Sequence, residues 1–100
     1  MINHFIFIKY QDTTLHSHID EFCTRMVTLP NEILEIASME VGLDILHDQR
    51  SWDLELVMQF VNVYGLRFYQ QHPSHQAAVT SNQTFVADLA SIDYEAPFSK

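Results

Sequence analysis

The residues of this chain that could do chemistry are concentrated in one short segment, Tyr69-Gln70-Gln71-His72-Pro73-Ser74-His75-Gln76. His72 precedes a proline, which favours an extended backbone, and Pro73 suits the first position of a helix. The segment is therefore predicted to be a joint between two helices, with Tyr69 near the end of the first and His75 in the first turn of the second. Because the N–H dipoles at a helix start disfavour a charged imidazole, we expect His75 to be neutral and able to accept a proton near pH 7.

Two interpretations of this joint remain open at the level of sequence. In the first, Tyr69 and His75 line a pocket, where the histidine acts as a base and the tyrosine donates a hydrogen bond to a developing oxyanion. In the second, Tyr69 packs in the core and its hydroxyl tethers the joint.

A third histidine, His4, lies in the segment 3–10, whose aromatic and β-branched residues predict a strand. Alternation places Ile6 and Ile8 on the same face as His4, and Phe5 and Phe7 on the opposite face. His4 is then either a buried histidine with partners inside the protein or a residue that faces a ligand. The two phenylalanines indicate that the second face of the sheet is also covered.

The remaining elements follow from hydrophobic spacing and turn residues. The predicted elements are a helix from Leu15 to Leu29 closed by Pro30, a strand within 34–46, a strand at 52–61, a helix from Asn62 to Gln71, a helix from Pro73 to about Thr84 and a strand near 88–95. The apolar residues predicted to share one face of the third strand are Trp52, Leu54, Leu56, Met58 and Phe60. The order βαββαβ is typical of a ferredoxin-like α+β domain, here residues 1–95 followed by a tail at 96–100. A sheet with helices on one side and apolar residues on the other predicts a homodimer that forms through the sheet face.

Composition excludes several kinds of partner. The net charge is −8, from 5 Lys and Arg against 13 Asp and Glu, and the five basic residues are scattered. Nucleic acid and anionic membranes are therefore unexpected partners. No apolar run reaches the ~20 residues of a membrane span.

Neither a cofactor nor a dedicated metal site is expected. The pairs His72/His75 and His16/His18 resemble fragments of zinc sites, but such a site needs three or four converging ligands. The single Cys23 cannot form an internal disulfide and suits a small buried hydrophobe. The N-terminal residues lack the basic start of a signal peptide, so a cytoplasmic location is expected.

Several blocks of the sequence resemble the stress-responsive dimeric α/β-barrel (Dabb) domain family. The matching blocks are residues 2–9, Glu40-Val41-Gly42, residues 52–60, residues 69–79 and Ile92-Asp93-Tyr94-Glu95. The resemblance implies a ferredoxin-like protomer that dimerises through its sheet into a barrel. Most family members have no established activity, but one plant branch, the olivetolic acid cyclases, closes a linear polyketide by aldol condensation. That branch uses residues matching His4, Tyr69 and His75.

Two classes of function follow. The first is an enzyme, similar to a polyketide cyclase or a lyase, that acts on a carbonyl compound with His75 as the base, Tyr69 as donor and His4 at the carbonyl. The second is a non-catalytic dimeric barrel that binds a small ligand or a partner in stress or metabolic regulation. A haem-degrading or antibiotic-biosynthesis monooxygenase is a weaker third. The expected pocket lining beyond the three candidates is Ile6, Ile8, Phe22, Met26 and His72, although a core stripe would explain Phe22 and Met26 equally well. An enclosed cavity reached by His4, Tyr69 and His75 would favour the first class, and a filled core the second.

Overall fold

The computed structural model describes residues 1–95, and the tail expected at 96–100 lies outside the described residues. The elements in chain order are β1 (Ile2–Tyr10), α1 (His16–Thr28), the short 3-10 helix η1 (Leu29–Asn31), β2 (Ile36–Leu43), β3 (Leu54–Phe60), α2 (Val63–Gln71), α3 (Pro73–Gln83) and β4 (Val86–Glu95). The predicted order is confirmed. Within the described part of the chain, no helix is long and apolar enough to cross a membrane.

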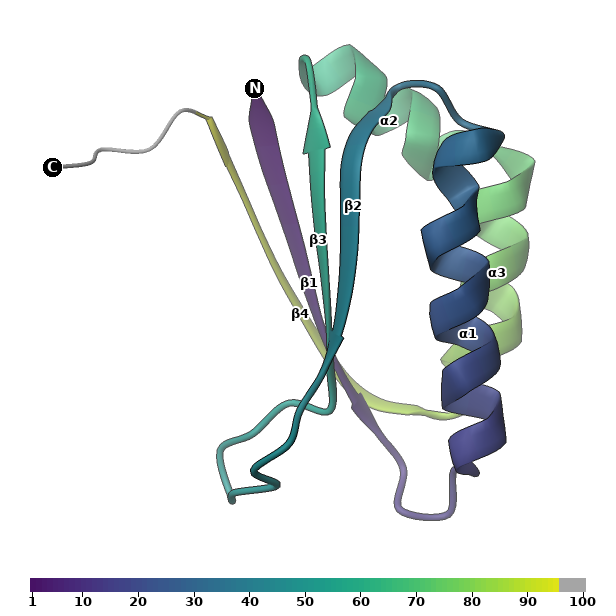
Figure 1. Ribbon diagram of the computed structural model, residues 1–100, viewed down its shortest axis with the longest axis vertical. Helices are drawn as coiled ribbons and strands as arrows, with labels where there is room; N and C mark the ends of the chain where they lie inside the picture. The colour runs from purple at the N-terminus through teal and green to yellow at the C-terminus, as the bar shows by residue number, and fades with distance from the viewer. Residues whose placement is uncertain (96–100) are drawn as a thin grey trace, which may run out of the picture.

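The four strands form one antiparallel sheet in the order β2-β3-β1-β4. All the helices lie on one side of this sheet (Figure 1). This arrangement is the ferredoxin-like α+β fold. The strand register decides which residues share a face, because directly paired residues point to the same side. His4 is paired with Met58 on β3 and with Asp93 on β4, so all three side chains face the helices.

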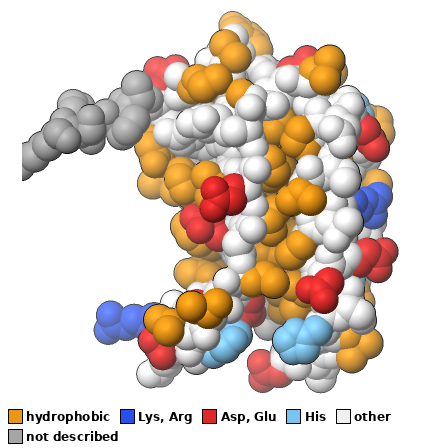
Figure 2. All heavy atoms as spheres, in the orientation of Figure 1, with side chains coloured by type: hydrophobic (Ala, Val, Ile, Leu, Met, Phe, Trp, Pro, Cys, Tyr) orange, Lys and Arg blue, Asp and Glu red, His pale blue; other side chains and the backbone are white. Residues whose placement is uncertain are grey.

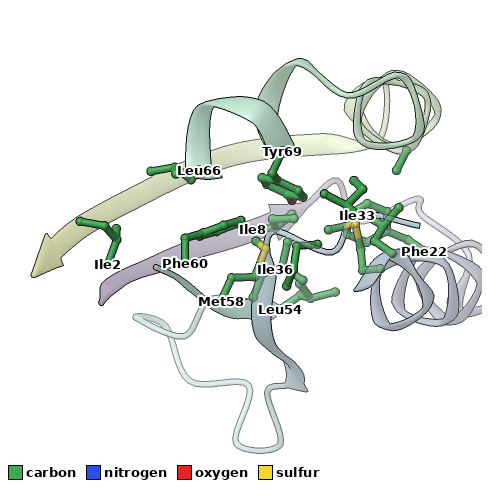
Figure 3. Close-up of a cluster of buried hydrophobic side chains, with 14 of the residues drawn as sticks. Ile2, Ile8, Phe22, Ile33, Ile36, Leu54, Met58, Phe60, Leu66 and Tyr69 are labelled. Carbon is green, nitrogen blue, oxygen red and sulfur yellow. The ribbon is translucent and has the colours of Figure 1, made fainter. Parts of the chain in front are cut away.

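The hydrophobic core lies between the sheet and the helices (Figure 3). From the sheet come alternate residues of β1 and β3, among them Ile8 and Phe60, and from α2 comes Tyr69, which extends toward the sheet. Met26 of α1 completes the layer and is 1% exposed. The helices are therefore held by burial of one face each, which is the main source of stability for a domain of this size.

The central joint of the chain is as predicted. His72 ends α2 with an extended backbone (φ −67°, ψ 136°), and Pro73 is the first residue of α3. The Nδ1 atom of His72 accepts a hydrogen bond from the backbone N–H of Ser74, at 3.1 Å, so the histidine caps the helix that follows it. Asn62 caps α2, with its side chain accepting a hydrogen bond from the N–H of Gly65 at 3.0 Å.

Helix α1 departs from the prediction at both ends. It begins at His16, one residue later than predicted, with no side-chain cap, and Leu15 is exposed. At the other end, Pro30 lies inside η1, because a proline is tolerated in the first turn of a new helical segment.

Strand β2 contains a bulge that interrupts the predicted alternation. Ile36 lies opposite Phe60 and Ser38 lies opposite Gln59, so Ala37 has no counterpart on β3. The sequence pattern predicts one apolar face running without interruption from 37 to 45. In the structure that face is limited to the middle of the strand, where Met39 and Val41 pack against the core, and Ile45, beyond the end of the strand, is exposed.

Trp52 was predicted to share the buried face of the third strand, and this prediction is wrong. Strand β3 begins only at Leu54, and the irregular backbone before it turns Trp52 to the other side of the sheet. Its ring lies 6.2 Å from that of Phe7, which points away from the helices. Two residues of non-strand backbone are enough to change the face that a side chain occupies.

The face of the sheet that points away from the helices is apolar at its centre and polar toward one end. Figure 2 shows hydrophobic side chains gathered along this side of the molecule, together with acidic ones. Phe5 of β1 stacks against Tyr94 of β4, with ring centroids 5.8 Å apart. Polar residues on this face are hydrogen-bonded across the strands: Ser38 donates to Gln59, and Gln59 donates to Asn3.

Candidate functional site

A cavity of about 480 Å³ lies between the helix-facing side of the sheet and the helices. The sequence-predicted residues that line it are His4, Ile6, Ile8, Phe22, Met26, Tyr69 and His75. The three candidate residues come from different elements: His4 from β1, Tyr69 from the last turn of α2 and His75 from the first turn of α3. His72, with its extended backbone, separates the helices that carry Tyr69 and His75, and both side chains line the same cavity.

The rings of the three candidates lie close together. The Tyr69 ring centroid is 4.3 Å from that of His75 and 6.3 Å from that of His4. Tyr69 therefore lies between the two imidazoles. Distances of this size allow one small molecule to contact all three side chains. Among the described residues, the hydrogen-bond partner of His4 is Asp93 and that of His75 is Gln70.

His4 is held in place by a carboxylate. Its Nδ1 atom contacts Oδ1 of Asp93, which lies opposite on β4. An ionised carboxylate can only accept hydrogen bonds, so Nδ1 carries the hydrogen and Nε2 is left free for the cavity. The His4 side chain is 4% exposed, whereas that of Asp93 is 41% exposed, so the carboxylate lies between the buried imidazole and solvent.

His75 has the same arrangement with a different partner. Its Nδ1 atom lies 3.0 Å from the backbone carbonyl oxygen of Gln70, which can only accept, so the hydrogen is again on Nδ1 and Nε2 is free. Burial is the largest influence on this ring and lowers its pKa; the Gln70 carbonyl opposes the shift, while His4 and His72 add to it. We predicted a neutral His75 from its place at a helix start, but the dominant cause in the structure is loss of solvent.

The Tyr69 hydroxyl is available to a ligand. None of the hydrogen bonds among the described residues uses it, yet no fully buried side-chain nitrogen or oxygen in this part of the chain lacks a partner. The hydroxyl must therefore contact open space, which for Tyr69 is the cavity that it lines. Burial raises the pKa of the phenol well above its ordinary value of 10.0, so the group keeps its proton and acts as a donor.

His72 is not part of the cavity lining, so its predicted place in the pocket is wrong. Its Nδ1 atom is used to cap α3, and its ring lies 6.0 Å from that of Phe68 on the outer side of α2. The restricted backbone before Pro73 explains this, because an extended His72 points away from the side that Tyr69 and His75 share.

Sequence reasoning missed the other polar residues that line the cavity, which are Gln70, Asn82, Gln83, Ser91 and Asp93. Asp93 lies on β4, and only the pairing of β4 with β1 brings it to His4. Asn82, which is 4% exposed, also lines the cavity. One signal for Asn82 was present in the sequence: it follows His75 by seven residues, which places the two on the same face of a helix.

No cluster of three His, Cys, Asp or Glu side chains that could hold a metal ion occurs within residues 1–95. In the two histidine pairs with zinc-like spacing, ring nitrogens are used in hydrogen bonds to other groups: Nδ1 of His72 bonds to the N–H of Ser74, and Nδ1 of His75 to the carbonyl of Gln70. His18 lies against Phe85, with ring centroids 4.1 Å apart, and its Nε2 atom is 3.0 Å from Oδ1 of Asn82.

The fold and the cavity together define a ferredoxin-like domain with a small-molecule-sized pocket between its sheet and its helices. Residues 2–96 match the Stress responsive A/B Barrel Domain, and the chain belongs to this Dabb family. No curated protein matches the chain by sequence.

Solved structures share the fold over almost the whole chain. A dimeric protein of unknown function with a ferredoxin-like fold from Bacteroides fragilis is 27% identical, with a TM-score of 0.85 over 95% of each chain. A dimeric ferredoxin-like protein of unknown function from Thermobifida fusca is 26% identical, with a TM-score of 0.84 over 93% of this chain and 88% of the other. The hydroxynitrile lyase from Passiflora edulis is 14% identical, with a TM-score of 0.86 over 99% and 95% of the two chains, a likeness of fold alone.

Proposed function

We propose that this Dabb protein binds a small carbonyl compound in the cavity and moves a proton at the carbon next to the carbonyl group. One observation carries the proposal: two imidazoles, each with Nδ1 occupied and Nε2 free, converge with a protonated phenol on one cavity. A base beside a hydrogen-bond donor is the minimum that enolate chemistry requires. The presence of a cavity between the three residues favours this class over a non-catalytic barrel.

Each side chain has a distinct role in this proposal. The Nε2 atom of His75 takes the proton from carbon, and the electrons of the broken C–H bond form the enolate. The Tyr69 hydroxyl donates to the enolate oxygen, where the negative charge develops. His4, held by Asp93, lines the same space and orients the carbonyl end of the ligand.

The experiment is deuterium exchange into 2-nonanone, a simple methyl ketone, followed by NMR in D₂O. The wild-type protein should accelerate exchange at the carbons beside the carbonyl, and His75→Ala should remove about 10²- to 10⁴-fold of any acceleration, the usual contribution of a general base. His72→Asn is the matched control, because it changes the neighbouring histidine outside the cavity and asparagine can still cap α3. Exchange no faster than in buffer, or an equal loss in both variants, would contradict the proposal.

We also propose that the protein is a cytoplasmic homodimer that forms through the open face of the sheet. The stacked pair Phe5 and Tyr94 and the half-exposed Ile92 give this face an apolar centre. The relatives from Bacteroides fragilis and Thermobifida fusca are described as dimeric. The free thiol of Cys23 fits a reducing compartment.

Sedimentation velocity at micromolar concentration tests the dimer. The wild-type protein should sediment as a dimer and Phe5→Asp as a monomer, because a carboxylate at the centre of an apolar interface cannot be solvated. Lys9→Asp is the control on the same strand face, away from the aromatic pair. A monomeric wild-type protein would refute this part of the proposal.

A further inference from the structure

One further polar residue of the cavity wall, Asn82, lies two helical turns from His75 along α3. Its side chain is almost completely buried, and its Oδ1 atom accepts two hydrogen bonds: one from the Tyr10 hydroxyl at 2.8 Å and one from Nε2 of His18 at 3.0 Å. Two donors on one oxygen fix the orientation of the amide plane, since rotation would lose both bonds.

This orientation leaves the amide NH₂ group for the cavity. None of the hydrogen bonds among residues 1–95 uses Nδ2 of Asn82, and no fully buried side-chain nitrogen or oxygen in this range lacks a partner. Nδ2 must therefore contact open space, and the space that Asn82 lines is the cavity. A fixed donor at the wall of a largely apolar pocket is the usual means of recognising an acceptor on a ligand.

The position of Asn82 along α3 sets the length of that ligand. Asn82 lies seven residues after His75, which is two helical turns or about 10.5 Å along the axis, on the same face. Val79 lies between them on this face and also lines the cavity. On the opposite wall Ile6 and Ile8 follow His4 along β1, with Ser91 and Leu89 beside them on β4, so the space between the two polar ends is mainly apolar.

We infer that Asn82 anchors the far end of an elongated ligand by donating a hydrogen bond to a second oxygen atom. The ligand has a reactive carbonyl near His75, an apolar segment about two helical turns long, and an acceptor such as a ketone at Asn82. This inference rests on the proposed function for the position of the reactive end and adds the substrate class. Tyr10 and His18 act as positioning residues, because they contact the amide oxygen and not the ligand.

The test compares two probes of equal chain length. Nonane-2,8-dione has a carbonyl near each end, whereas 2-nonanone has one, and the difference in affinity measures the second acceptor. The symmetric dione has a twofold statistical advantage, so the wild-type protein should bind it about three- to tenfold more tightly beyond that factor, as expected for one net hydrogen bond. Affinities are measured by NMR titration of the ¹⁵N-labelled protein.

Two variants locate the donor. Asn82→Asp keeps an oxygen for Tyr10 and His18 but replaces the NH₂ group, and it should reduce the preference to the twofold factor. Gln83→Ala is the matched control, since Gln83 is the next residue and a second amide of the lining. A third readout is independent of any variant: the side-chain NH₂ signals of Asn82 in the wild-type protein should shift with the dione and stay in place with 2-nonanone.

The inference is overturned if the wild-type preference does not exceed twofold, if Asn82→Asp retains it, or if Gln83→Ala alone removes it. These outcomes are separate from those of the proposed function. Absence of deuterium exchange with an intact dione preference would refute the chemistry and keep the anchor. Deuterium exchange without a preference for the dione would refute the anchor at Asn82 and keep the proposed chemistry.

Discussion

The hydroxyl groups of two buried tyrosines have different roles: that of Tyr10 bonds within the protein, and that of Tyr69 faces the cavity. Removing each hydroxyl in turn distinguishes the two roles. The Tyr69 hydroxyl faces the cavity without a partner among the described residues, whereas the Tyr10 hydroxyl donates to Asn82 at 2.8 Å. Burial raises the pKa of Tyr10 to about 12 and that of Tyr69 further, so both are protonated donors at neutral pH. Tyrosine to phenylalanine removes only the oxygen and preserves the packing of the ring.

The expected magnitudes follow from these contacts. Tyr10→Phe loses one buried hydrogen bond, but Asn82 still accepts from His18, so the cost in unfolding free energy is about 1 kcal/mol. For a domain of this size that lowers Tm by about 4–8 °C. Tyr69→Phe loses no protein hydrogen bond and should change stability by no more than about 0.5 kcal/mol. It should slow deuterium exchange into 2-nonanone by about 10²- to 10³-fold, the usual cost of removing one oxyanion donor.

The assay pairs thermal unfolding at equal protein concentration with the NMR exchange measurement, because a dimer makes Tm depend on concentration. The reasoning is refuted if Tyr69→Phe lowers Tm as much as Tyr10→Phe, since the hydroxyl would then have a partner in the protein. It is also refuted if Tyr69→Phe exchanges 2-nonanone at the wild-type rate.

Three further predictions concern the same scaffold. Asp93→Ala should release His4 from its single tautomer, which would change the ¹⁵N chemical shifts of the His4 ring. Asp93→Asn keeps an acceptor and should preserve the tautomer. Equal spectra in all three proteins would contradict the assigned contact. Burial lowers the pKa of His75, so below pH 6.5, its ordinary pKa, the unfolded chain binds a proton that the folded chain does not. The contribution of His75 to the free energy of unfolding is therefore complete above pH 6.5 and is lost as the pH falls toward the folded pKa. Urea unfolding of His75→Ala should show a smaller decrease over that range, and an identical pH profile would rule the contribution out. Met58→Ala, at a position that is 0% exposed, should cost about 2–5 kcal/mol by urea unfolding, and a cost below 1 kcal/mol would show that the core collapses onto the gap.

The element order could be predicted because each signal is local. The alternating apolar residues of β1 and the restricted backbone at His72-Pro73 act within a few neighbours, and both predictions are confirmed. The failures occur where the backbone departs from regular geometry. One is the bulge at Ala37, and the other is the irregular backbone before Leu54, which places the Trp52 side chain on the opposite face of the sheet. Both depend on how β2 and β3 pair, and a local sequence pattern does not contain that pairing.

The sequence by itself determined the residue types of the site and the helix joint that brings Tyr69 and His75 to one end of α3. It also determined the face of β1 that His4 occupies, because strand alternation is a property of the backbone. Only the tertiary structure decided the partners. Asp93 reaches His4 across 89 positions of chain because β4 pairs with β1, and Asn82 is oriented by Tyr10 and His18 from two other elements. Contacts between distant segments depend on register and packing, which a one-dimensional pattern does not contain, so the chemical groups could be named from the sequence while their hydrogen-bonding states could not.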